Sequence, residues 1–224
     1  MNSEIELDSI IKKHPYSASF KEADTGKYIL VNDRLARDVG AADPQELVGL
    51  TVHDLQSTQT KALSDTAAQI EKLDFLACEN KEPAQSRLMF CKSDGGAVLY
   101  EEIIKVPVLS RGGKTLGVVT YQRNLTPIMP LNDVYNAYRR FYTAPEAVEH
   151  MLNYLDIKHC FSTPPSEAPL RVLLARAERY SNKQIGNLLG ISHRTVDYQL
   201  DALRDRVIDG DLRHVLALIA RSVK

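Results

Sequence analysis

The sequence of 224 residues has no apolar run that approaches the roughly 20 residues needed to cross a bilayer. Its first residues, MNSEIELDSIIKK, are acidic and have no long apolar centre, so they are not expected to act as a secretory signal. With 44% hydrophobic and 25% charged residues, the composition is that of an ordinary water-soluble protein. We therefore expect a cytoplasmic protein with no membrane partner, long enough for one large domain or two modest ones.

Cysteine is scarce and shows no pattern. The three cysteines, Cys78, Cys91 and Cys160, form no C-x-x-C pair and are odd in number, so no disulfide framework is expected and a reducing compartment fits best. No spacing supports a metal site. We expect part-buried thiols, although Cys91 on a strand is a candidate for sensing oxidation.

Catalytic motifs are also absent from the sequence. There is no G-x-x-x-x-G-K-[ST], no G-x-S-x-G, no H-E-x-x-H and no Gly-rich loop between a strand and a helix. The chain has no room for a kinase or cyclase output domain, and it lacks a phosphoacceptor pattern. The protein is therefore not expected to be an enzyme.

The N-terminal half begins with a predicted hairpin. The runs YSASFKEA and KYILV flank a turn at residues 24–26. Asn32 is the predicted N-cap of the helix NDRLARDVG, which Gly40 ends. Further helices are expected at residues 3–13, at PQELVG and over residues 58–78.

After Pro83 the pattern changes to β structure. The runs SRLMFCK, AVLYEEIIKVPVL and KTLGVVTYQRNLT are separated by Gly-containing turns at residues 94–96 and 111–113. The first 126 residues thus predict two strands, several helices and three more strands. This order suits a five-stranded antiparallel sheet with helices gathered on one side, which is an α+β fold.

This half resembles a PAS sensor domain over about residues 10–126. The resemblance rests on D-T-G between the first two strands, ILVND at the end of the second, ELVGLTVHDL in the middle and YQRNLT at the close. The region GLTVHDLQS lacks the reactive cysteine of a flavin photoreceptor, and residues 58–78 lack the histidine of a haem-binding member. His53 is expected to be a loop or cap residue. No cofactor is predicted, and the sequence leaves open a small metabolite or no ligand at all.

Residues 127–164 form a predicted helical connector. Asn132 is the expected cap of the helix DVYNAYRRFY, and Thr143 with Glu146 forms a capping box that begins the next helix. Both helices carry apolar stripes, which we expect to pack against the sensor or against a second subunit. The proline-rich stretch FSTPPSEAP marks the boundary of the last domain.

The last 60 residues predict four helices. LRVLLARAERY is the first, and the capping box of Ser181 and Gln184 begins the second, NKQIGNLLG. Gly186 allows a crossing helix to come close, Gly190 allows a tight turn, and Ser192 caps the third helix. That helix carries a core stripe, and DLRHVLALIARSV is the fourth. The stripe consists of Val196, Leu200, Leu203 and Val207.

Residues 165–224 resemble the LuxR-type helix-turn-helix of bacterial transcription factors, and SNKQIGNLLGISHRTV is the most specific part. The resemblance implies a scaffold helix at 182–190, a recognition helix at 193–207 and a fourth helix that helps form a dimer. It also assigns phosphate or backbone contacts to Lys183, Thr195 and Arg206. The sequence departs from the family where Asp197 replaces a common Lys and Gln199 a common His.

On a helical wheel of the third helix, the side opposite the core stripe faces outward. It carries Arg194, Tyr198, Asp201 and Asp205. Because base contacts usually come from the first turns, Arg194 is the candidate for guanine and Gln199 for adenine. Asp197 or Asp201 can accept from cytosine, while their charge lowers affinity for random DNA. The candidate DNA-binding residues are Lys183, Ser192, His193, Arg194, Thr195, Asp197, Tyr198, Gln199, Asp201 and Arg206.

The sequence therefore predicts a bacterial transcription regulator with an α+β PAS-like sensor domain (1–126), a helical connector (127–164) and an all-α four-helix LuxR-type domain (165–224). From Pro165 onward the charge is a net +3, against −4 for the remainder. The expected partners are double-stranded DNA and a second copy in a homodimer, with RNA polymerase as a further candidate. The alternative is a signalling protein whose helix-turn-helix binds protein rather than DNA.

Overall fold

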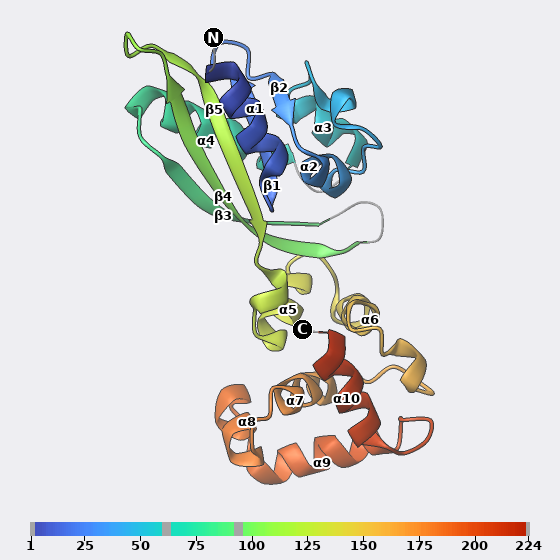
Figure 1. Cartoon of the computed structure of the whole chain (residues 1–224). Coiled ribbons are helices and arrows are strands. Elements are labelled where there is room, and N and C mark those ends of the chain that lie inside the picture. The colour runs from blue at the N-terminus through green and yellow to red at the C-terminus, as the bar shows by residue number, and fades with distance from the viewer. Residues whose placement is uncertain (1–2, 60–63, 92–95, 223–224) are drawn as a thin grey trace. The chain divides into compact units, whose positions relative to one another are not determined.

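The computed structural model describes residues 3–59, 64–91 and 96–222 (Figure 1). The chain divides into two compact units. The N-terminal unit comprises Met1–Gly95 and Leu99–Leu125, and the C-terminal unit comprises Gly96–Val98 and Thr126–Lys224. Within the part of the chain that is described, no helix is both long and apolar enough to cross a membrane.

The N-terminal unit is built on one five-stranded sheet with the strand order β2-β1-β5-β4-β3. The pairs β1–β2, β1–β5 and β4–β5 are antiparallel. This sheet confirms the predicted five-stranded antiparallel fold. The structure adds that the first hairpin lies beside the last strand of the later meander. The strands are β1 (Ser17–Glu22), β2 (Tyr28–Val31), β3 (Ala84–Cys91), β4 (Val98–Leu109) and β5 (Thr115–Asn124).

The helices of this unit agree with the sequence except in the middle. The predicted long helix over residues 58–78 is in fact the end of α3 followed by α4, and residues 60–63 between them lie outside the described residues. Part of the turn expected at 94–96 and the side chain of Cys91 also lie outside them. The elements are α1 (Ser3–Lys13), α2 (Asp33–Asp38), the 3-10 helix η1 (Pro44–Leu47), α3 (Val52–Gln59) and α4 (Ser64–Asn80).

Helices cover both faces of the sheet, which corrects the expectation that they gather on one side. Ile11 of α1 packs with Ala18 and Val119. Asp74 of α4 instead contacts Lys21 and Lys105. Successive strand residues point to opposite faces, so Ala18 and Lys21 of β1 lie on different faces. The N-terminal helix therefore closes the face that α4 leaves open.

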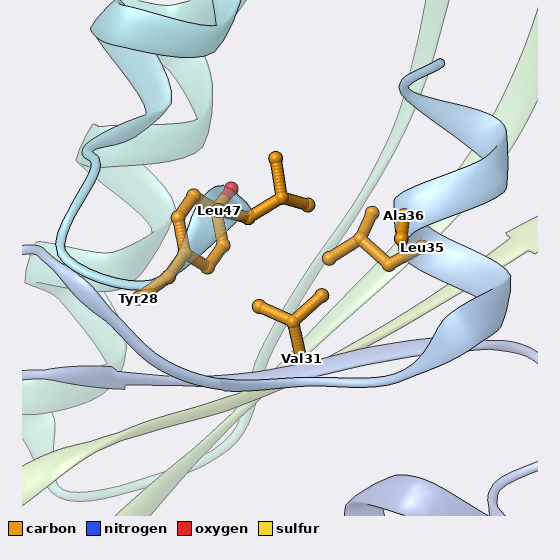
Figure 2. Packing of buried hydrophobic residues seen from close by; sticks show 5 residues of the cluster. All are labelled: Tyr28, Val31, Leu35, Ala36 and Leu47. Atoms are coloured by element: carbon orange, nitrogen blue, oxygen red, sulfur yellow. The ribbon is translucent and has the colours of Figure 1, made fainter. Parts of the chain in front are cut away.

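On the α4 side, β2, α2 and η1 meet in a small apolar cluster (Figure 2). Tyr28 and Val31 of β2 pack there with Leu35 and Ala36 of α2 and Leu47 of η1. All five residues are at most 6% exposed. The cluster fixes α2 against the second strand.

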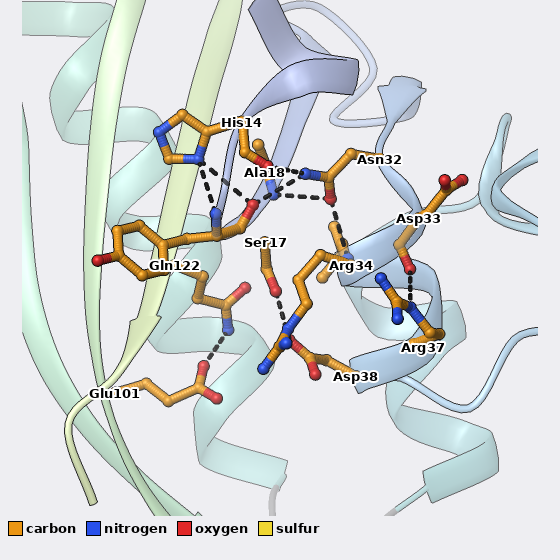
Figure 3. A network of polar contacts seen from close by, with 12 residues as sticks. His14, Ser17, Ala18, Asn32, Asp33, Arg34, Arg37, Asp38, Glu101 and Gln122 are labelled. Atoms are coloured by element: carbon orange, nitrogen blue, oxygen red, sulfur yellow. Dashed lines mark hydrogen bonds and ion pairs between the residues drawn. The ribbon is translucent and has the colours of Figure 1, made fainter. Parts of the chain in front are cut away.

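Asn32 links this cluster to the start of the first strand (Figure 3). Its Oδ1 accepts from Leu35 N at 2.9 Å, which confirms the predicted N-cap, and also from Ala18 N at 3.1 Å. Its Nδ2 donates to Tyr16 O at 2.8 Å and to His14 O at 3.3 Å. Since Asn32 is 2% exposed, this side chain is satisfied entirely by the protein.

Two lysines share one carboxylate inside the N-terminal unit. Lys21 Nζ lies 2.8 Å from Asp74 Oδ2, and Lys105 Nζ lies 2.6 Å from Asp74 Oδ1. Lys105 Nζ also donates to Thr120 Oγ1 at 3.0 Å. The lysine side chains are only 3% and 1% exposed. Burial, together with the neighbouring ammonium of Lys21, lowers the pKa of Lys105 to about 8.

The C-terminal unit is helical and is organised around α7 (Figure 1). Four consecutive residues of α7, from Val172 to Ala175, are fully buried, so the helix is enclosed on every side. It packs against α5, α6, α8, α9 and α10. These helices are α5 (Leu131–Tyr138), α6 (Ala144–Tyr154), α7 (Glu167–Ala177), α8 (Asn182–Leu189), α9 (His193–Arg204) and α10 (Leu212–Ser222), with 3-10 turns η2 (Thr126–Ile128) and η3 (Lys158–Cys160).

The apolar stripes of the connector face α7, not a second subunit. Tyr135 of α5 and Met151 and Leu152 of α6 are fully buried within the single chain. The stripes therefore give no support for a dimer.

Of the two capping predictions for the connector, one is confirmed and one is wrong. The capping box of Thr143 and Glu146 is present. Asn132 is not the N-cap of α5, because Pro130 occupies that position. The Asn132 side chain instead donates to Arg171 O of α7 at 3.2 Å, and Glu178 accepts from Leu131 N at 2.7 Å.

The buried charges generate a prediction for stability. Asp74→Asn leaves two buried ammonium groups without a carboxylate, so we expect the free energy of unfolding to fall by about 3–5 kcal/mol. Lys105→Met removes the excess charge, so we expect it to be neutral or stabilising. Urea unfolding of both variants at pH 7 measures the difference. An equal fall in the free energy of unfolding of the two variants would contradict the prediction.

The same cluster predicts how stability depends on pH. Between pH about 8 and the ordinary lysine pKa of 10.5, folded Lys105 has released a proton that the unfolded chain still holds. The free energy of unfolding should therefore rise with pH over this interval. Lys105→Met should lack the rise.

Candidate nucleic-acid interface

The turn between α8 and α9 is set by local hydrogen bonds that the sequence predicts. Ser181 and Gln184 form the capping box of α8. Ser192 Oγ accepts from Thr195 N at 3.0 Å and so caps α9. Gly190 has φ of 67°, a left-handed conformation that side-chain-bearing residues seldom adopt. These contacts define where each helix begins and ends.

Gly186 permits a close backbone approach, although not to a crossing helix. A Cβ at this position would lie 2.7 Å from Ile191 O. Ile191 N donates to Gly186 O at 2.9 Å. The close approach expected from the sequence is therefore made by the turn itself.

The outward face of α9 is as the helical wheel predicts. Arg194, Asp201 and Asp205 are exposed, and Tyr198 is 70% exposed. Val196, Leu200 and Leu203 are buried in the opposite direction. The first two turns of the helix thus present the guanidinium of Arg194 and the phenol of Tyr198 to the solvent.

The other candidate residues differ in their exposure. Lys183 on α8 and His193 at the start of α9 are exposed. Ser192 is exposed but bonded to Thr195 through their hydroxyl oxygens at 2.8 Å. Thr195 and Gln199 are half-buried. A contact from Gln199 to a base therefore requires the helix to tilt.

Two of the three acids on α9 have partners within the chain. Asp197 accepts a hydrogen bond from Asn182 Nδ2 at the beginning of α8. Asp201 is paired with Arg204 three residues later. Asn182 and Arg204 were not among the predicted site residues. The i,i+3 spacing of Asp201 and Arg204 could have indicated their pair, whereas no local signal links Asn182 to Asp197.

Arg206 lies beyond α9, the predicted recognition helix, which ends at Arg204 and not at residue 207. Its side chain is half-buried, and Nη1 donates to Pro164 O at 2.9 Å. Val207 pairs with Phe161 in an antiparallel bridge. The position that the resemblance assigned to the backbone of DNA is therefore engaged with the protein itself.

The polar groups inside the N-terminal unit are bonded to one another. The ammonium groups of Lys21 and Lys105 contact Asp74, and Lys105 also donates to the Thr120 hydroxyl. Across the described residues, no three His, Cys, Asp or Glu side chains are arranged to hold a metal ion.

The chain combines a PAS-like five-stranded sheet with a four-helix fold that contains a helix-turn-helix. No protein-family model matches the sequence, and no curated protein matches it.

Solved structures are similar to most of the chain. The VqmA–ligand–DNA complex of Vibrio cholerae is 17% identical over 98% of this chain and 88% of that chain, with a TM-score of 0.53. The phage VqmA–DPO complex is 19% identical over 96% and 85%, with a TM-score of 0.46. The PAS domain of Bordetella pertussis BvgS is 17% identical over 55% and 87%, at 0.44. Of these three, the first supports a shared fold.

The two glycines of the turn allow a matched pair of substitutions. Gly186→Ala places a Cβ against the Ile191 carbonyl, so we expect the free energy of unfolding to fall by roughly 1–3 kcal/mol. At Gly190 a Cβ meets open space, so Gly190→Ala should cost only the left-handed strain of about 1–2 kcal/mol. Chemical denaturation of the two variants measures both effects. A stabilised Gly186→Ala would show that the turn relaxes.

Proposed function

We propose that the protein is a cytoplasmic transcription regulator without enzymatic activity, in which a PAS-like sensor unit controls DNA binding by the C-terminal helix-turn-helix. The observation that carries the proposal is the exposed beginning of α9, where Arg194 in the first turn and Tyr198 in the second are directed away from a buried stripe. A helix N-terminus with an exposed Arg suits the major groove, where a guanidinium can bind guanine O6 and N7.

The proposal includes a homodimer. Two copies related by a two-fold axis would place their α9 helices in successive major grooves, about 34 Å apart. The solved VqmA–ligand–DNA complex has a similar fold and contains DNA, which supports the DNA-binding part of the proposal. A selected site should therefore contain two half-sites, and sedimentation should give two chains per duplex. RNA polymerase is a further proposed partner.

The test begins with duplexes selected from a random pool. Arg194→Ala should weaken binding to the selected duplex by roughly 1–3 kcal/mol per subunit, because it removes a base contact. Lys183→Ala should weaken selected and random duplexes alike, and it should flatten the dependence of log K on log salt by about 0.9 per subunit. Fluorescence anisotropy across a salt series measures both quantities.

Two outcomes would contradict the proposal, the first in favour of its rival and the second in its orientation of α9. If the parent protein binds no duplex at low salt while it is folded, the helix-turn-helix is an interaction module for protein. If the parent binds and Arg194→Ala binds equally well, α9 is presented to DNA in a different orientation.

The paired acids generate a further prediction. Asp201→Asn removes a charge that phosphates repel and releases Arg204 from an exposed ion pair, which itself contributes only about 0–1 kcal/mol. Affinity for random duplex should rise at low salt, and the rise should shrink as salt screens it. Asp205→Asn, a turn further along, is the matched control and should change affinity less. An unchanged affinity in folded Asp201→Asn would favour the protein-binding alternative.

A further inference from the structure

The last residues of the connector are bonded to the residues that follow α9. We call residues 160–164 the strap. Ile208 N donates to Cys160 O at 3.0 Å, and Ser162 N donates to Arg206 O at 2.9 Å. Phe161 and Val207, at 7% and 8% exposure, form the bridge between these bonds. The proline-rich stretch at the boundary of the last domain therefore begins with residues that are paired like a short strand.

Arg206 is bonded to the strap at both of its ends. Its carbonyl accepts from Ser162 Oγ at 3.0 Å in addition to Ser162 N. Its guanidinium donates to Pro164 O at 2.9 Å. A guanidinium has five N–H donors in a fixed plane, so the bond to Pro164 also sets the direction of the others. Arg206 thus holds the strap through hydrogen bonds of both its main chain and its side chain.

We propose that Arg206 and Ser162 are positioning residues that set the orientation of α9 against DNA, and that Arg206 is not a phosphate contact. This inference rests on the proposed function. The strap begins at Cys160, the last residue of η3, and ends shortly before α7, so it ties the connector to the segment that follows α9.

The geometry makes α9 sensitive to this attachment. Ten residues separate Arg194 from Arg204, a distance of about 15 Å along the helix axis. A tilt of about 4° at the strap would move Arg194 by about 1 Å. Hydrogen bonds to base edges weaken over smaller displacements than this. Loosening the strap should therefore reduce selectivity for a site more than it reduces general affinity for DNA.

The test compares two kinds of substitution in the full chain. Arg206→Ala removes the bond to Pro164 together with a charge, whereas Ser162→Ala removes a bond to Arg206 O and no charge. We expect Arg206→Ala to weaken binding to the selected duplex roughly 10-fold, as for one charge-assisted hydrogen bond, and Ser162→Ala roughly threefold. Ser162→Thr retains the hydroxyl and should restore binding. In every variant the slope of log K against log salt should equal that of the parent.

The salt slope discriminates positioning from phosphate contact. If Arg206→Ala lowers the slope by about 0.9 per subunit and weakens random duplex equally, Arg206 is a phosphate contact and the inference fails. It also fails if Ser162→Ala, confirmed as folded by thermal unfolding, binds the selected duplex as tightly as the parent. A parent that binds no duplex at all overturns the proposed function itself, and the inference with it. Lys183→Ala provides the comparison for a lost phosphate contact.

Discussion

Burial of α7 on every side is the constraint on which the C-terminal unit depends. Successive residues of a helix point about 100° apart, so four consecutive buried residues require neighbours in all directions. The connector helices α5 and α6 supply some of these neighbours, and α8, α9 and α10 supply the others. Connector and helix-turn-helix therefore share one hydrophobic core. Removing the connector would expose α7 to water, so the unit that folds is larger than the four predicted helices.

This shared core restricts how a signal can act on DNA binding. Freeing α9 from the connector would expose apolar surface of α7. It would also break the hydrogen bonds that Leu131 N donates to Glu178 and that Asn132 donates to Arg171 O. Such a cost is large compared with the few kcal/mol that separate regulatory states. Under the proposed function, a signal therefore acts by moving the C-terminal units of a dimer as whole bodies, with α9 carried by the strap.

The sequence predicted those features whose partners lie three or four residues apart. The caps at Asn32, Ser181 and Ser192 and the left-handed Gly190 are of this kind, because a short spacing determines their contacts. Asn132 and Arg206 are different, since their side chains bond to Arg171 and Pro164, about 40 residues away. An Asn near the start of a helix can cap it or reach a neighbour, and only the packing of α5 on α7 selects between them. Helix α3 was missed because VHDLQSTQ carries too few apolar residues to show a helical period.

The acidic recognition helix is consistent with DNA binding once its charges are placed along the axis. His193 and Arg194 occupy the first turn, where the helix dipole adds partial positive charge. The acids begin at Asp197, which is held by Asn182, and continue with Asp201, which is paired with Arg204. The helix is thus positive at its beginning and neutralised or negative toward its end. A helix with this polarity is attracted to a phosphate-lined groove by its N-terminus and repelled along its length, which favours entry by the tip. The tip is also the end farthest from the strap, so the angle at which α9 enters the groove depends most on how its other end is held.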